Sequence, residues 1–110
     1  MSRKGHLHIR DKKGITNIPY TIIVRIEAQR SYCIIYMENG AFFMIPKSMK
    51  TVVEIIGSEN FAKPHRSHYV NLEKVEHVNK TKCIVNMNNG HIIPISKTEK
   101  AAFIEVFNRF

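Results

Sequence analysis

The chain has 110 residues, the size of a single domain, and 44% of them are apolar, as in globular proteins. No apolar run approaches the ~18 residues of a membrane span, and the charged residues 1–6 precede no hydrophobic stretch, so we expect neither a membrane segment nor a secretory signal. Seventeen Lys and Arg residues against nine acids give a net charge of +8, which favours polyanionic partners, nucleic acid first and anionic membrane second.

The N-terminal segment carries half of this excess charge. Residues 1–14 contain five basic residues and one acid, namely Arg3, Lys4, Arg10, Lys12, Lys13 and Asp11. Polar and apolar residues alternate over 6–10, which predicts a strand, and the turn over 11–14 leads into a second strand over 15–18. We expect residues 1–14 to form a basic arm or a first strand ahead of a domain that spans 15–110.

A hairpin followed by a helix is predicted next. The β-branched runs over 22–27 and 32–37 suit buried strands, and Glu38-Asn39-Gly40 predicts a type I′ turn before a third strand over 41–45. Ser48 can cap a short helix that ends at Gly57. Its apolar residues recur at helical spacing, which indicates core packing: Met49, Val52, Val53 and Ile56.

The middle of the chain is its most polar part. Pro64 disfavours helix at the preceding residue, so an extended stretch or turn is expected over 61–71. Asn71 is expected to cap the turn over 72–74.

The hairpin-then-helix unit then occurs again. Residues 83–90 echo 33–40 and end in the same Asn-Gly pair, and a strand with Ile93-Pro94 follows. Ser96 and Glu99 have the spacing of a capping box and open a helix whose apolar stripe predicts core packing: Phe103, Val106, Phe107 and Phe110. The fold class is therefore mainly β, with short antiparallel sheets, a small helix after the first hairpin and a short C-terminal helix.

Lysines gather at both predicted helix starts. Lys47 and Lys50 flank Ser48, while Lys97 and Lys100 follow Ser96. Free backbone N–H groups, a hydroxyl and ammonium groups together suit a phosphate. The alternative is two pairs of solvated lysines without a ligand.

The polar segment offers a base reader rather than a catalyst or a metal site. Arg66 can present a planar fork to guanine or phosphate, and Ser67 can add a hydroxyl. His65 and His68 lack further ligands at suitable spacing, so we expect no metal, and a structural role for His65. Ser67 and His68 would point to opposite faces of a strand, and no catalytic motif occurs, so an enzyme is not expected.

Three further features exclude other classes. Cys33 and Cys83 lie in apolar runs, which argues against a disulfide framework and favours a reducing cytoplasm. Asp11 is the only aspartate, so the chain contains no phosphoacceptor receiver. Glu27, the one acid in a buried-looking strand, is expected to pair with Arg25 or Arg30.

Three blocks resemble the LytTR family of DNA-binding domains. Arg25-Ile26-Glu27-Ala28-Gln29-Arg30-Ser31-Tyr32 is similar to the family's opening "I-E-A-x-x-x-Y". The stretch His65-Arg66-Ser67-His68-Tyr69-Val70-Asn71-Leu72 resembles its "H-R-S-x-x-V-N-L", and Asn89-Gly90 through Pro94-Ile95-Ser96-Lys97 resembles its closing "N-G-x-x-x-P-(I/V)-S-R". The blocks occur in the right order, over about residues 15–105.

The resemblance implies an elongated, mostly β protein whose strand-connecting loops enter successive major grooves and bend the DNA. It implies base contacts from five residues: Arg30, Ser31, Tyr32, Arg66 and Lys97. It implies backbone contacts from six others: Lys47, Lys63, Ser67, Ser96, Thr98 and Lys100. The family usually has Arg where this chain has Lys97, and a lysine lacks the bidentate fork of an arginine, so phosphate contact is the firmer expectation there.

The expected function is sequence-specific binding of double-stranded DNA by a bacterial, cytoplasmic transcription regulator. The chain would be a stand-alone regulator or the effector domain of a response regulator in a two-component system. The resemblance implies paired direct repeats, a dimer on DNA, a sensor kinase or receiver domain outside this chain, and no cofactor. Two alternatives remain: a β module that stacks RNA or single-stranded bases on aromatic side chains, and a non-catalytic protein-interaction module.

Overall fold

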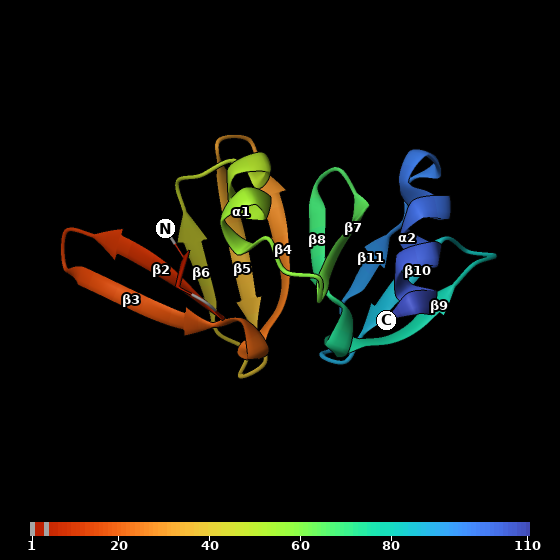
Figure 1. The fold of residues 1–110 in the computed structure, drawn as a ribbon, viewed down its shortest axis with the longest axis horizontal. Helices are drawn as coiled ribbons and strands as arrows, with labels where there is room; N and C mark the ends of the chain where they lie inside the picture. Colours follow the sequence, from red (N-terminus) through yellow and green to blue (C-terminus); the bar gives the residue numbers. More distant parts are fainter. Residues whose placement is uncertain (1, 4) are drawn as a thin grey trace.

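The computed structural model describes residues 2–3 and 5–110, and for residues 2–3 only the backbone is described. The molecule measures 45 × 25 × 23 Å and consists of three antiparallel sheets and two α-helices arranged along its long axis (Figure 1). The predicted fold class, mainly β and elongated with short sheets, is confirmed.

The N-terminal sheet is a hairpin with a short added strand. It contains β1 (Ser2–Arg3), β2 (His6–Asp11) and β3 (Gly14–Pro19) in that order. The Asp11 carboxylate accepts the backbone N–H groups of Lys13 and Gly14 at 2.8 and 3.0 Å, which fixes the turn between β2 and β3. Leu7 and Ile9 of β2 are buried in the core.

The central sheet has five strands in the order β6-β5-β4-β8-β7. They are β4 (Ile23–Gln29), β5 (Tyr32–Met37), β6 (Phe42–Ile45), β7 (Phe61–His65) and β8 (His68–Asn71). A 3₁₀ turn, η1 (Tyr20–Ile22), precedes β4, so this strand begins one residue later than predicted. Pro64 lies on the edge strand at a break in register, where a residue without an N–H removes no ladder hydrogen bond.

The third sheet has the order β11-β10-β9. It contains β9 (Val75–Asn79), β10 (Ile84–Met87) and β11 (Ile92–Pro94). Before it comes the 3₁₀ turn η2 (Leu72–Lys74), where the Asn71 side chain accepts the N–H of Glu73 at 3.1 Å, as predicted. The sequence did not predict β9, because the adjacent polar residues Glu76 and His77 obscure its alternation.

Both helices begin at the predicted caps. In α1 (Met49–Ile56) the Ser48 side chain accepts from the N–H of Thr51, and Gly57 ends the helix with a φ of 49°. In α2 (Lys97–Arg109) the Ser96 hydroxyl accepts from the N–H of Glu99 at 3.2 Å. The expected reciprocal bond of the capping box is absent among the described hydrogen bonds, because the Ser96 N–H instead donates to the Pro64 carbonyl at 3.0 Å.

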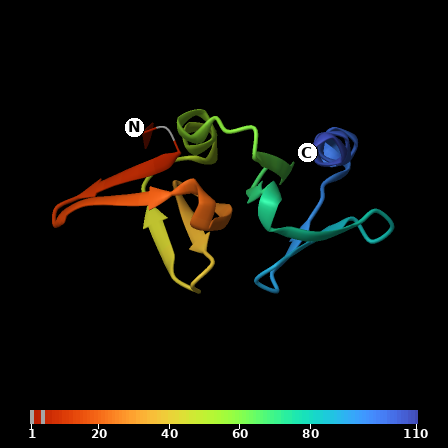
Figure 2. The same cartoon turned by 60° about the horizontal axis from the view of Figure 1, so that its bottom comes forward.

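Two hydrophobic cores lie on opposite faces of the central sheet. The first joins β2, β3, α1 and one face of all five central strands, and the second joins β4, β8, β10, β11 and α2. Ile23 pairs with Met37 and Arg25 with Tyr36, so Val24 is an extra residue in β4, a β-bulge. Neighbouring side chains of the strand point to opposite faces, so Ile23 is buried in the first core and Val24 in the second. After a 60° turn both helices lie toward the top of the view, α1 above the central strands and α2 above the third sheet, so each helix covers a different core (Figure 2).

The apolar stripe of α2 is less buried than predicted. Phe103 is 2% exposed, but Val106 and Phe107 are half-buried and Phe110 is 52% exposed. The prediction of core packing is therefore wrong for Phe110. The helix runs alongside β7, and its last turn extends past the strand to the level of Asn60.

The first Asn-Gly hairpin turn differs from the predicted type I′, and the second Asn-Gly turn has the same form as the first. Only the glycines have positive φ, 85° at Gly40 and 90° at Gly90. Met37 and Met87 each accept from the N–H of the glycine three residues on and donate to the carbonyl four residues on. These are three-residue loops that close on a left-handed glycine, which needs no positive φ at the asparagine.

Candidate nucleic-acid interface

Four turns or helix starts lie along one edge of the molecule, the upper edge in Figure 1. They are the β4–β5 turn, the β7–β8 turn and the starts of α1 and α2. We call this the basic edge and define it by the residues that it carries: Arg30, Ser31, Tyr32, Lys47, Lys63, Arg66, Ser67, Ser96, Lys97, Thr98 and Lys100.

Hydrogen bonds and strand register hold these segments together. The N–H of Ala28 donates to the Ser67 carbonyl at 2.8 Å, so the β7–β8 turn lies beside the end of β4. Cys33 pairs with Ile45 across β5 and β6, which brings the segment before α1 next to the β4–β5 turn. The bond from Ser96 to Pro64 places the start of α2 beside β7. The structure therefore brings residues from four distant parts of the sequence to one edge.

The opposite edge carries η1, η2, two hairpin turns and the end of α2. Its cations are paired: Lys74 binds Glu38 at 2.7 Å, and Arg109 lies 3.7 Å from Glu105. In the described part of the chain, no ion pair involves Arg30, Arg66 or Lys97. All three are exposed. Of these two edges, the basic edge is thus the one whose exposed cations Arg30, Arg66 and Lys97 have no ion-pair partner in the described part of the chain.

The β4–β5 turn presents Arg30 and Ser31 between the paired residues Gln29 and Tyr32. Arg30 has a φ of 29°, a positive value that is uncommon for a residue with a Cβ. Ser31 is exposed, whereas Tyr32 is half-buried on β5. The tip of this turn therefore consists of a guanidinium and a hydroxyl.

The β7–β8 turn presents Arg66 in the same manner. His65 pairs with His68, and the His65 Nδ1 accepts the N–H of Ser67 at 3.1 Å. The structural role predicted for His65 is thereby confirmed. The two imidazole rings meet edge to face at 5.3 Å, and burial lowers the pKa of His68 below its usual value. Arg66 projects from a two-residue loop that is braced by two imidazoles.

The starts of the helices place further residues on the basic edge. Lys47 and Thr98 are exposed, and Lys63 is half-buried on β7. Lys100 differs from the others, because its Nζ donates to the Lys80 carbonyl at 2.8 Å. Its ammonium group is therefore already engaged by the turn between β9 and β10.

A buried arginine joins the central sheet to the third sheet, a role that the sequence did not predict. Arg25 is 8% exposed; its Nε donates to the His91 Nδ1 at 2.8 Å and its guanidinium lies 4.1 Å from the centre of the Tyr36 ring. It also binds Glu27 at 2.8 Å, which was one of the two predicted pairings. Burial opposes the ionisation of Glu27, but the hydrogen bond and charge of Arg25 outweigh burial and lower its pKa. The sequence did contain a signal for this contact, because an arginine inside an apolar strand needs a buried partner for its charge.

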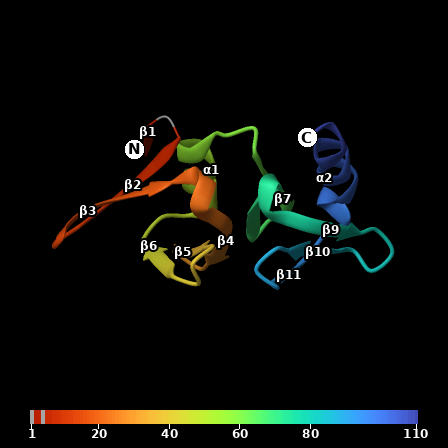
Figure 3. The same cartoon turned by 90° about the horizontal axis from the view of Figure 1, so that it is seen from below.

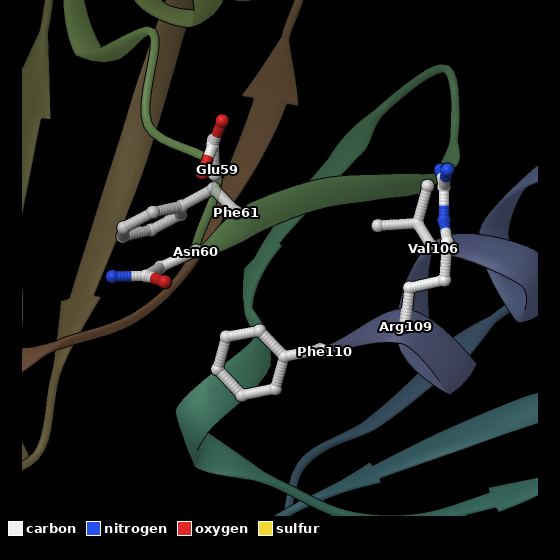
Figure 4. Close-up of a pocket in the computed structure, with 6 residues that line it drawn as sticks. All are labelled: Glu59, Asn60, Phe61, Val106, Arg109 and Phe110. Carbon is white, nitrogen blue, oxygen red and sulfur yellow. The ribbon is translucent and has the colours of Figure 1, made fainter.

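A hollow of about 630 Å³ lies away from the basic edge, between the start of β7 and the end of α2 (Figure 4). Its lining includes Asn60, Arg109 and the exposed ring of Phe110. In the part of the chain that the structure describes, no three His, Cys, Asp or Glu side chains converge as a metal site would require. Nor does any helix there combine the length and apolarity needed to cross a membrane.

Comparisons with known proteins agree with this geometry. The sequence model of the LytTr DNA-binding domain matches residues 13–108. A solved LytTr DNA-binding domain from Bacillus cereus superposes with a TM-score of 0.79 over 98% of this chain and all of that one, at 18% sequence identity, and so has the same fold. None of the curated proteins compared matches the chain. The match over most of its length shows that the chain belongs to the LytTR family of DNA-binding domains.

Proposed function

We propose that the chain binds double-stranded DNA in a sequence-specific manner, with the turns of the basic edge in successive major grooves. The observation that supports this most is the segregation of charge: the exposed cations Arg30, Arg66 and Lys97 lack acidic partners, whereas those of the opposite edge have them. A polyanion would meet an edge that contains guanidinium and ammonium groups at the tips of rigid turns.

The proposed roles of the residues follow from their exposure and chemistry. Arg30, Ser31, Tyr32 and Arg66 would contact bases, and the guanidinium fork of the two arginines fits the two acceptors of guanine. Lys97 would contact a base or, more simply, a phosphate. The remaining residues of the basic edge would hold the backbone: Lys47, Lys63, Ser67, Ser96, Thr98 and Lys100.

The regulatory context is part of the same proposal. The chain would act in the bacterial cytoplasm as a transcription regulator, alone or as the effector domain of a two-component response regulator. It would bind paired direct repeats as a dimer on DNA, under the control of a sensor kinase or receiver that lies outside these residues. The fold comparison and the family membership support DNA binding itself.

The test begins with selection of duplexes from a random pool by the purified domain. On the selected duplex, log K should fall with log salt by roughly 0.9 per phosphate neutralised. Arg66→Ala should cost on the order of 1–3 kcal/mol on that duplex and relax preference at one position. The control is Arg109→Ala, which removes the same charge from the opposite edge and should leave binding unchanged.

Three results would contradict the proposal. Equal losses on selected and random duplexes for Arg66→Ala would exclude it as a base reader. Single-stranded DNA or RNA that competes as well as duplex would point to a base-stacking module. A domain without salt-sensitive duplex binding would point to a protein-interaction module.

A further inference from the structure

The turn between β9 and β10 carries two lysines that neither the family resemblance nor the basic edge includes. Lys80, Thr81 and Lys82 are all exposed at this turn. It lies at one end of the long axis, opposite the β2–β3 turn (Figure 3). In the described part of the chain, neither Lys80 nor Lys82 forms an ion pair.

Four hydrogen bonds hold this turn in a defined shape. Asn79 Oδ1 accepts the N–H of Lys82 at 2.9 Å, and the Cys83 Sγ donates to the Lys80 carbonyl at 3.6 Å. The Cys83 carbonyl accepts the N–H of Ile95 at 2.8 Å. Cys83 has a φ of 54°, in the left-handed region that residues with a Cβ rarely adopt. The backbone of the turn is therefore fixed, although the lysine side chains themselves lie in solvent.

The fourth bond connects the turn to the basic edge. Lys100, in the first turn of α2, donates from its Nζ to the Lys80 carbonyl at 2.8 Å. This bond holds the β9–β10 turn beside the first turn of α2, which begins at Lys97. Lys100 thus ties the backbone of the turn that carries Lys80 and Lys82 to the helix whose start the proposed function assigns to DNA.

We infer that Lys80 and Lys82 form a separate contact to the DNA backbone, on the duplex that flanks the bases read by the basic edge. This inference rests on the proposed function. The molecule is 45 Å long, which corresponds to about 13 base pairs at roughly 3.4 Å each, more than one helical turn. Because the β9–β10 turn lies at the end of this length, it reaches the duplex beyond the position of Lys97. Lys100 is a positioning residue in this arrangement.

The test measures how affinity depends on duplex length and on salt. The selected duplex is extended step by step, first on one side and then on the other. The wild-type domain should gain affinity when the flank beyond the Lys97 contact grows, and the double variant Lys80→Ala/Lys82→Ala should lose this gain. The variant should also reduce the salt slope by roughly 0.9 for each phosphate released, with an unchanged base preference.

Two controls separate this contact from folding and from general charge. Lys80→Arg/Lys82→Arg keeps both charges and should retain the wild-type slope and flank gain. Arg109→Ala removes a charge from the opposite edge and should change neither. Thermal unfolding of the alanine variant should match the wild type, because every hydrogen bond of the turn uses backbone atoms or the side chains of Asn79, Cys83 and Lys100.

The failure of this inference can be told apart from failure of the proposed function. If the wild type binds a selected duplex but the alanine variant keeps its salt slope and flank gain, only the β9–β10 contact is overturned. If the wild type shows no salt-sensitive duplex binding, both are overturned. A change in base preference in the alanine variant would make the turn a base reader and would also overturn a backbone contact.

Discussion

Arg25 and His91 are 66 residues apart in sequence, yet the Nε of the arginine donates to the Nδ1 of the histidine at 2.8 Å. The bond connects β4 to the β10–β11 turn and so joins the sheet that carries Arg30 to the sheet that leads to Lys97. A hydrogen bond that enters Nδ1 requires this nitrogen to be unprotonated, which makes the contact sensitive to the ionisation of His91.

Replacement of Arg25 should destabilise the domain strongly. Arg25→Met leaves Glu27 half-buried without its cation and removes the Nε–H that binds His91, and about 3 kcal/mol of unfolding free energy should be lost. Urea denaturation measures this. Lys74→Met, which removes a more exposed ion pair with Glu38, should cost under ~1 kcal/mol. If the two variants lost similar unfolding free energy, the contacts of Arg25 between the central and third sheets would contribute no more to stability than the exposed ion pair.

Stability should decrease as the pH falls below 7. Burial is the main reason that the pKa values of His91 and His68 are lowered in the folded protein. Unfolding then takes up protons below the ordinary histidine pKa of about 6.5, so the folded state loses stability between that value and the lower folded one. Thermal unfolding at pH 7.5 and 5.5 should show a lower Tm at the acidic pH.

A variant isolates the share of His91 in this effect. His91→Gln offers an amide oxygen to Arg25 without a titratable ring, and should reduce the difference in Tm between the two pH values. His77→Gln, on the exposed face of β9, should leave the difference as it is in the wild type. If both variants behave alike, His91 does not cause the pH dependence.

The Ser96 cap should contribute to both stability and position. Ser96→Ala removes the acceptor of the Glu99 N–H and should cost about 1 kcal/mol, measured by urea denaturation. Thr98→Ala, on the exposed side of the same helical turn, should cost only a few tenths. A loss as small as that of Thr98→Ala would mean that the bond from Ser96 to Pro64 alone holds the start of the helix.

Arg30→Gly should separate stability from DNA affinity. Glycine adopts the φ of 29° without the steric cost that a Cβ imposes, so stability should be maintained or rise by up to about 1 kcal/mol. The guanidinium is lost, so affinity for the selected duplex should fall. Arg30→Ala should lose the same affinity without the gain in stability. Equal affinity of Arg30→Gly and wild type would remove Arg30 from the proposed base contacts.

Lys97→Arg should increase the preference of the domain for one DNA sequence over others, without increasing its affinity for DNA of any sequence. Charge is unchanged, so the salt slope should remain that of the wild type. A bidentate fork should add preference for guanine at one position of the selected duplex. Repeating the selection with the variant measures this, and an unchanged consensus would indicate that residue 97 contacts only a phosphate.

Local patterns predicted most of the fold. The caps at Ser48, Ser96 and Asn71 lie where predicted, because each depends on a side chain that binds backbone N–H groups two or three residues away. The predicted type I′ turn over 38–40 and the predicted burial of Phe110 were wrong. A loop can close on one left-handed glycine, and the end of α2 lies beyond the strand that the helix covers. The β9 strand was missed because polar and apolar residues do not alternate clearly along it, and its pairing with β10 cannot be inferred from its own sequence.

For the site, too, the residue types could be predicted from the sequence, whereas the contacts between distant segments could not. Arg66 and the lysines at the helix starts were found from their residue types, and their common edge follows from pairings that join distant segments. The contact of Lys100 with the Lys80 carbonyl and that of Arg25 with His91 could not be predicted, because both depend on how separate sheets are placed.

The bulge at Val24 has a consequence for how the family's sequences vary. Ile23 and Val24 serve different cores, and a slip of one residue in β4 would turn each side chain away from its own core and toward the opposite face of the sheet. Evolution should therefore preserve Ile23, Val24 and Arg25 as strictly as any base reader, although none of them lies on the basic edge. Relatives that bind unrelated operators should differ at Arg30 and agree in β4. Conserved residues in β4 would then reflect the needs of the fold, and variable residues in the β4–β5 turn would reflect the DNA sequence that is read.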